Sequence, residues 1–118
     1  MMHAYHKDDA AKLVPLLESI VTEVADRRRT IRTLERSLAT EKENGSPQPV
    51  TGPIRARLAS ERRELRLATK ELERLGCSFD EHNPNRVMIP GTDGGESGFH
   101  WDAGETEVHV NAPESTVF

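Results

Sequence analysis

The sequence predicts a mainly α fold with a small β element. The fold is an antiparallel two-helix hairpin, similar to a coiled coil, with a short antiparallel β-hairpin packed at its base. Three observations predict it: two apolar seams with heptad spacing, a Pro/Gly-rich break between them, and a strand-turn-strand pattern near the end of the chain. With 118 residues, 35% of them hydrophobic and 31% charged, we expect one domain over 1–118 with long, solvated helices.

The first helix is predicted over 7–43. Its carboxylates Asp8 and Asp9 favour the positive end of the helix dipole, and Asn44-Gly45 ends it. Pro15 lacks a backbone donor, so we expect a kink or a new helix start there. Apolar residues recur at alternating steps of four and three, with one polar interruption: Leu13, Leu17, Ile20, Val24, Arg27, Ile31, Leu34 and Leu38.

The segment 44–53 is predicted to be a loop, and the second helix is predicted over 54–75. Pro53 suits a first helical position, and Gly76 suits the left-handed conformation of a C-cap. The second seam is Ile54, Leu58, Glu61, Leu65, Ala68, Leu72 and Leu75. Packing inside the hairpin is expected from Leu13, Leu17, Ile20, Val24, Leu65, Leu72 and Leu75.

Residues 76–96 are predicted to form a loop with a short strand at 86–89. A β-hairpin over 97–110 and a tail over 111–118 follow. With Trp101 opposite Thr106, the apolar and polar side chains of the hairpin separate onto two faces. An isolated two-stranded hairpin is marginal in water, so its apolar face must pack on another surface.

The first helix is longer than the second, so it overhangs at its start. Either the β-hairpin or a second subunit covers this overhang, and we expect a non-enzymatic interaction or structural module that forms a homodimer or binds another protein. The expected interaction surface is Val14, Leu16, Val21, Phe99, Trp101 and Val108.

Arg27 and Glu61 occupy seam positions where leucine would pack better, and Arg27 falls level with the small Ala68. Polar seam residues disfavour slipped pairings at a cost in stability, so a role in fixing the register is one interpretation. The other is that both side chains extend to the edge of the seam and have no specific role.

The charge is unevenly distributed: residues 1–26 carry −3, residues 27–75 carry +6 and residues 76–118 carry −7. In an antiparallel pair, the e positions of both helices share one flank. This places one set of cations together, relieved mainly by Glu35. We call this set the basic flank: Arg28, Arg32, Arg36, Arg55, Arg62, Arg66 and Lys70. It could bind nucleic acid, but a solvated face neutralised by the acidic C-terminal region is favoured, because no base-stacking aromatic residues accompany the cations.

Sites for chemistry are few. His100, Glu107 and His109 share the polar face of the predicted β-hairpin and are candidate metal ligands, although solvent-facing alternation explains them better. The single cysteine, Cys77, follows a helix C-terminus, which does not lower a thiol pKa. We therefore expect no catalytic residues, no cofactor and no enzymatic activity.

No apolar run reaches the ~20 residues that span a bilayer, and the first residues do not resemble a signal peptide. A single cysteine fits a reducing compartment. A cytoplasmic protein that does not bind membranes is expected.

Three segments resemble a small prokaryotic family, the domain of unknown function 2203. They are Tyr5–Pro15, with an aromatic, two acids, alanine, two aliphatics and proline; Leu72–Asp80; and Trp101–Val108, with tryptophan, two spacers, Gly-Glu and Glu-aliphatic. Asn111-Ala112 stands where members usually carry Trp-His, and Ala11 stands where they have asparagine. A site built by that tryptophan and histidine would be absent here. The resemblance implies a helical hairpin with a small β element and no established activity.

Overall fold

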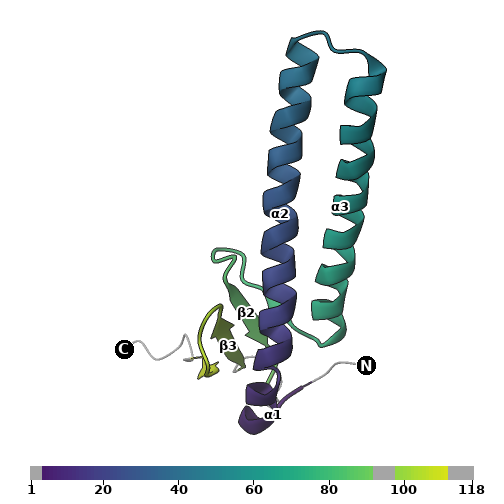
Figure 1. Ribbon diagram of the computed structural model, residues 1–118. Coiled ribbons are helices and arrows are strands. Elements are labelled where there is room, and N and C mark those ends of the chain that lie inside the picture. Colours follow the sequence, from purple (N-terminus) through teal and green to yellow (C-terminus); the bar gives the residue numbers. More distant parts are fainter. Residues whose placement is uncertain (1–3, 92–97, 112–118) are drawn as a thin grey trace. The chain divides into compact units, whose positions relative to one another are not determined.

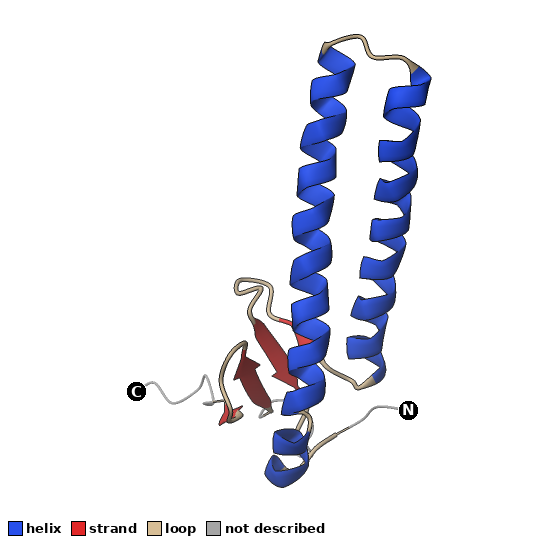
Figure 2. Cartoon of the chain, viewed as in Figure 1, coloured by secondary structure: helices blue, strands red, loops and turns tan. Residues whose placement is uncertain are grey.

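The computed structural model describes residues 4–91 and 98–111, and Figure 1 labels the main elements. The protein is mainly helical, with α2 packed against α3 and a small antiparallel sheet (Figure 2), which confirms the predicted fold class. The chain forms two compact units. Residues up to Val21 and from Glu71 onward form the first, and Thr22–Lys70 forms the second. That the whole chain is one domain stays a prediction.

The predicted first helix is divided into α1 (Lys7–Lys12) and α2 (Val14–Glu43). The break lies at Leu13, two residues before Pro15. Because a proline has no N–H and its ring crowds the carbonyl four residues back, the turn at Leu13 separates the two helices. At its other end α2 stops at a glycine with positive φ: Gly45 has a φ of 67°, and the Ser46 N–H donates to the Glu41 carbonyl.

The second long helix, α3 (Gln48–Arg74), begins six residues earlier than the predicted start at 54. The loop predicted over 44–53 is therefore wrong in its second half. The Pro47 carbonyl accepts hydrogen bonds from the N–H groups of Val50 and Thr51, which closes the first turn. Pro49 lies in that turn, where its missing N–H costs nothing, and Pro53 lies inside the helix near its start.

The sheet has four antiparallel strands in the order β1 (Ser78–Phe79), β2 (Arg86–Ile89), β3 (Phe99–Asp102) and β4 (His109–Val110). The short strand predicted at 86–89 is β2, and the predicted hairpin supplies β3 and β4. β1 lies in a segment predicted to be a loop, and no partner strand was predicted for β2. The sheet therefore has one strand more than the three that were predicted.

The register between β3 and β4 differs from the prediction by two residues. His100 pairs with His109 and Phe99 with Val110, so the strands are joined by a longer turn than the one that would place Trp101 opposite Thr106. Because side chains alternate with a period of two, a slip of two residues keeps every side chain on its predicted face. At the other end of β3, the Arg86 guanidinium donates to both Asp102 carboxylate oxygens, at 2.7 and 3.1 Å.

The core of the first unit is apolar and centred on Trp101, which has no exposed surface. Its Nε1–H donates to the Glu105 carbonyl at 2.7 Å, and this bond anchors the turn before β4. The N-terminal segment joins the unit through Tyr5, whose hydroxyl donates to the Leu75 carbonyl at 2.7 Å. The buried apolar residues of this unit are Ala10, Val14, Leu17, Ile20, Val21, Leu72, Cys77, Val87, Ile89, Trp101 and Val108.

Candidate interaction surface

The second unit is a two-helix hairpin whose apolar seam is only partly covered. Val24, Leu58 and Ala68 are buried, but most seam residues toward the loop are half-buried. Two helices cannot enclose the residues between them, because a seam side chain has a partner helix on one side and solvent above and below. The half-buried seam residues of this unit are Ile31, Leu34, Leu38, Ile54 and Leu65.

The seven residues expected to pack inside the hairpin are not equally enclosed. Leu17, Ile20, Val24 and Leu72 are buried. The remaining three, Leu13, Leu65 and Leu75, are half-buried.

The two polar seam residues bind each other. Arg27 Nη1 lies 3.0 and 3.2 Å from the two carboxylate oxygens of Glu61, and Glu23 lies 3.8 Å from Arg27 Nε. The hydrogen bond that Arg27 donates to Glu61 is the main cause that raises the pKa of Arg27. Glu61 keeps 13% of its side-chain surface exposed. Arg27 was expected level with Ala68, and its bond with Glu61 was not predicted. A cross-seam bond of this kind suits the register interpretation.

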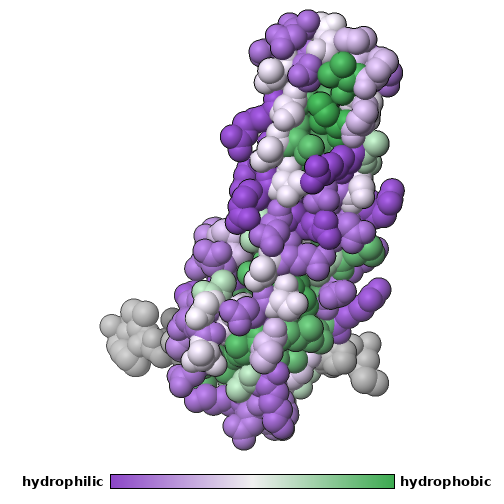
Figure 3. Space-filling model, in the orientation of Figure 1, coloured by the Kyte–Doolittle hydropathy of each residue, from purple (hydrophilic) through white to green (hydrophobic). Residues whose placement is uncertain are grey.

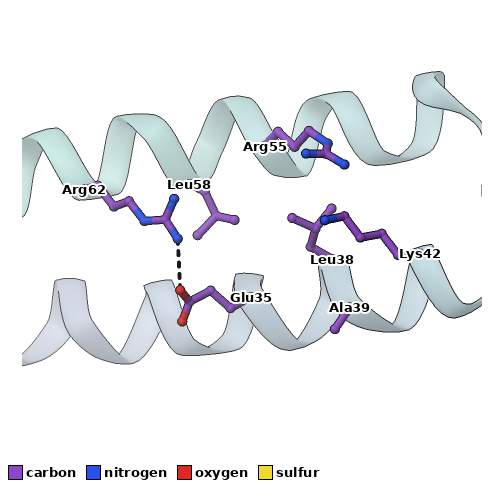
Figure 4. Close-up of a pocket in the computed structure, with 7 residues that line it drawn as sticks. All are labelled: Glu35, Leu38, Ala39, Lys42, Arg55, Leu58 and Arg62. Atoms are coloured by element: carbon purple, nitrogen blue, oxygen red, sulfur yellow. Dashed lines mark hydrogen bonds and ion pairs between the residues drawn. The ribbon is translucent and has the colours of Figure 1, made fainter.

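A groove of about 420 Å³ runs along one side of this hairpin, where the e positions of both helices meet (Figure 4). Leu38 and Leu58 lie between the helices. Arg62 of α3 donates a hydrogen bond to Glu35 of α2 at 2.9 Å. Glu35 is the acidic residue that was expected to offset the positive charge of the basic flank. Around this groove stand Glu35, Leu38, Ala39, Lys42, Arg55, Leu58 and Arg62.

Only two residues of the predicted basic flank, Arg55 and Arg62, line this groove, and Lys42 joins them there. Lys42 occupies an e position on α2, seven residues after Glu35, so heptad counting could have identified it. The other five residues of the flank are exposed elsewhere on the hairpin: Arg28, Arg32, Arg36, Arg66 and Lys70.

The expected interaction surface of the first unit is mostly buried within the chain. Trp101 is fully buried, and Val14, Val21 and Val108 keep 6–8% of their surface. The expectation that these four residues form an interaction surface for a partner is therefore wrong, because they belong to the unit's own core. Their burial fits the alternative in which the β-hairpin covers the start of the predicted first helix. Leu16 is 45% exposed and Phe99 is half-buried.

The candidate metal ligands are not assembled into a three-residue site. His100 and His109 are cross-strand neighbours with ring centroids 5.3 Å apart, but each binds elsewhere: His100 Nδ1 lies 2.6 Å from Asn111 Oδ1, and His109 Nε2 lies 2.9 Å from Glu105 Oε2. Glu107 is exposed in the turn, outside the strands. Within residues 4–91 and 98–111, no group of three or more His, Cys, Asp or Glu side chains could hold a metal ion.

Cys77 is the remaining residue with reactive chemistry. It is 2% exposed, and burial raises the pKa of its thiol to about 11. A thiol that stays protonated at neutral pH is a poor nucleophile. Its environment is that of a core residue of the first unit.

Comparisons with known proteins give a family. A family model described as "Uncharacterized conserved protein (DUF2203)" matches residues 3–112, which confirms the family expected from the three motif segments. No curated protein and no solved structure matches the chain. Among the helices of the described residues, none is long and apolar enough to cross a membrane.

Proposed function

Because the chain belongs to the DUF2203 family of uncharacterized conserved proteins, we propose its function from its own surfaces: a non-enzymatic interaction module that pairs with a second copy of itself. The pairing surface is the loop end of the hairpin, formed by the last turns of α2 and the first turns of α3. The observation that supports it is the incomplete burial of the seam in this region.

Figure 3 shows an apolar area at this end of the hairpin, bordered by hydrophilic residues. The region carries the half-buried Leu34, Leu38 and Ile54, and Val50 is 43% exposed. Burial of apolar surface of this kind stabilises an association by ~25 cal/mol per Å² removed from water. A second hairpin laid on it would complete a four-helix arrangement, the common way in which paired helices bury their seams.

The hairpin offers enough surface for such a pairing. From Thr22 to Glu43, α2 extends about 33 Å, and two adjacent helices present a face roughly 20 Å wide. The resulting area of about 650 Å² approaches the ~800 Å² that each partner contributes to a stable interface. The dimer therefore needs most of the hairpin's length, including the apolar loop end.

The test compares two exposed apolar residues of α3. Val50 lies at the loop end, while Leu67, which is 47% exposed, lies outside the seam on the same helix. Sedimentation velocity of Val50→Glu should show a shift to the monomer, and Leu67→Glu should sediment as the unchanged chain does. Equal dissociation by both variants, or no effect of Val50→Glu on a dimer, would assign the contact to another surface.

A further inference from the structure

The groove shown in Figure 4 shares Leu38 with the apolar loop-end area, but Leu34, Val50 and Ile54 do not line it. Its walls come from two antiparallel helices, with Lys42 on α2 and Arg55 and Arg62 on α3. A third helix packs in this position in helical bundles, at interaxial distances of 8–10 Å. The groove therefore has the geometry of a site for a helix.

Its charge is unbalanced. Arg62 and Glu35 neutralise each other as an exposed ion pair, with 50% and 51% of their side chains accessible. Arg55 and Lys42 have no ion-pair partner in the part of the chain that the structure describes. Two positive charges thus remain at the loop end of the groove. A ligand that meets them must carry negative charge.

Its floor is apolar. Leu58 is 3% exposed, Leu38 is half-buried, and the short side chain of Ala39 leaves room for a close approach. A nucleic-acid backbone presents charged phosphates and gains nothing from such a floor, whereas aliphatic side chains gain by leaving water. In addition, none of the groove's lining residues is aromatic, so the groove has no aromatic platform for stacked bases.

We propose that this groove binds an acidic amphipathic helix of a partner protein. Leucine-like residues of that helix, spaced by three or four, pack on Leu38, Ala39 and Leu58. Its glutamates or aspartates meet Arg55 and Lys42. This inference rests on the proposed role of the hairpin as an interaction module. It does not depend on self-association, whose surface includes the loop-end area and shares Leu38 with the groove.

The experiment titrates the full-length protein into a fluorescently labelled 18-residue helical peptide and follows its anisotropy. The peptide carries leucine at heptad a and d positions and glutamate on both flanks. A matched peptide with lysine in place of glutamate and a labelled DNA duplex are the comparison probes. We expect saturable binding of the acidic peptide, weakened by added salt, and no saturable binding of the lysine peptide.

Two charge reversals on α3 locate the site. Arg55→Glu should weaken binding of the acidic peptide about tenfold, since it removes an attraction and adds a repulsion. Arg63→Glu makes the same change at an exposed position that does not line the groove, and should leave the affinity within about twofold. Circular dichroism of both variants verifies that each is folded.

Several outcomes would overturn the proposal. One is equal affinity for the acidic and the lysine peptide. Another is an equal loss of affinity for the acidic peptide in Arg55→Glu and Arg63→Glu. The third is that the acidic peptide does not bind, whereas the DNA duplex binds and Arg55→Glu abolishes its binding. Val50→Glu separates this inference from self-association, because a monomeric variant should still bind the acidic peptide. If the chain is monomeric yet binds the peptide through Arg55, only the self-association fails.

Discussion

Replacement of Trp101 should destabilise the first unit strongly and leave self-association untouched. The side chain is fully buried, and its Nε1–H holds the Glu105 carbonyl at 2.7 Å. Trp101→Ala removes both the packing and the bond, and substitutions of this type cost about 3–5 kcal/mol. For a chain of this length, with an unfolding entropy of about 250 cal/mol/K, this lowers Tm by roughly 12–20 °C.

Trp101→Phe divides the effect into its parts. Phenylalanine keeps most of the apolar volume but cannot donate a hydrogen bond, so we expect a loss of about 1–2 kcal/mol. Urea denaturation followed by far-UV circular dichroism measures both variants, since fluorescence of the only tryptophan is lost. A cost below about 1 kcal/mol for Trp101→Ala would refute its place in the core. A lower oligomeric mass of Trp101→Ala without a loss of stability would instead place Trp101 in an interface with a partner.

Two further predictions concern the seam and the cysteine. Arg27→Met leaves the carboxylate of Glu61, only 13% exposed, without its cation, so Tm should fall; replacing both residues by leucine should recover the loss or exceed it. Thermal unfolding of the single and double variants measures this, and a double variant less stable than Arg27→Met would contradict it. Burial raises the pKa of the Cys77 thiol from 9.0 to about 11, so above pH 9 the unfolded chain loses this proton before the folded chain does. Stability should therefore fall between pH 9 and 11, and Cys77→Ala should remove part of that fall. An equal decrease of the urea midpoint between pH 9 and 11 in both proteins would exclude this contribution.

The helical part of the fold could be predicted because it depends on local signals. Heptad spacing sets the facing residues, and Gly45 and Gly76 adopt positive φ where the sequence predicts helix ends. The start of α3 at Gln48 could not be predicted from the same rules. Prolines suit both a loop and a first helical turn, and only the hydrogen bonds to the Pro47 carbonyl distinguish the two.

The sheet and the candidate sites depended on long-range contacts that the sequence does not specify. Alternation gave the correct faces of β3 and β4, but a slip of two residues preserves alternation, so it could not fix the register. The Trp101 Nε1–H donates to a backbone carbonyl, which a residue of any type would supply, so this bond cannot be predicted from the sequence. Conversely, the e-position rule placed Arg62 near Glu35, because heptad geometry determines flank contacts directly.

The most direct test of the proposed function is the mass of the unmodified chain in solution. Sedimentation equilibrium over a wide range of protein concentration should give twice the 13.2 kDa of one chain, with dissociation only at the lowest concentrations. A mass of 13.2 kDa at every concentration would contradict self-association through the hairpin.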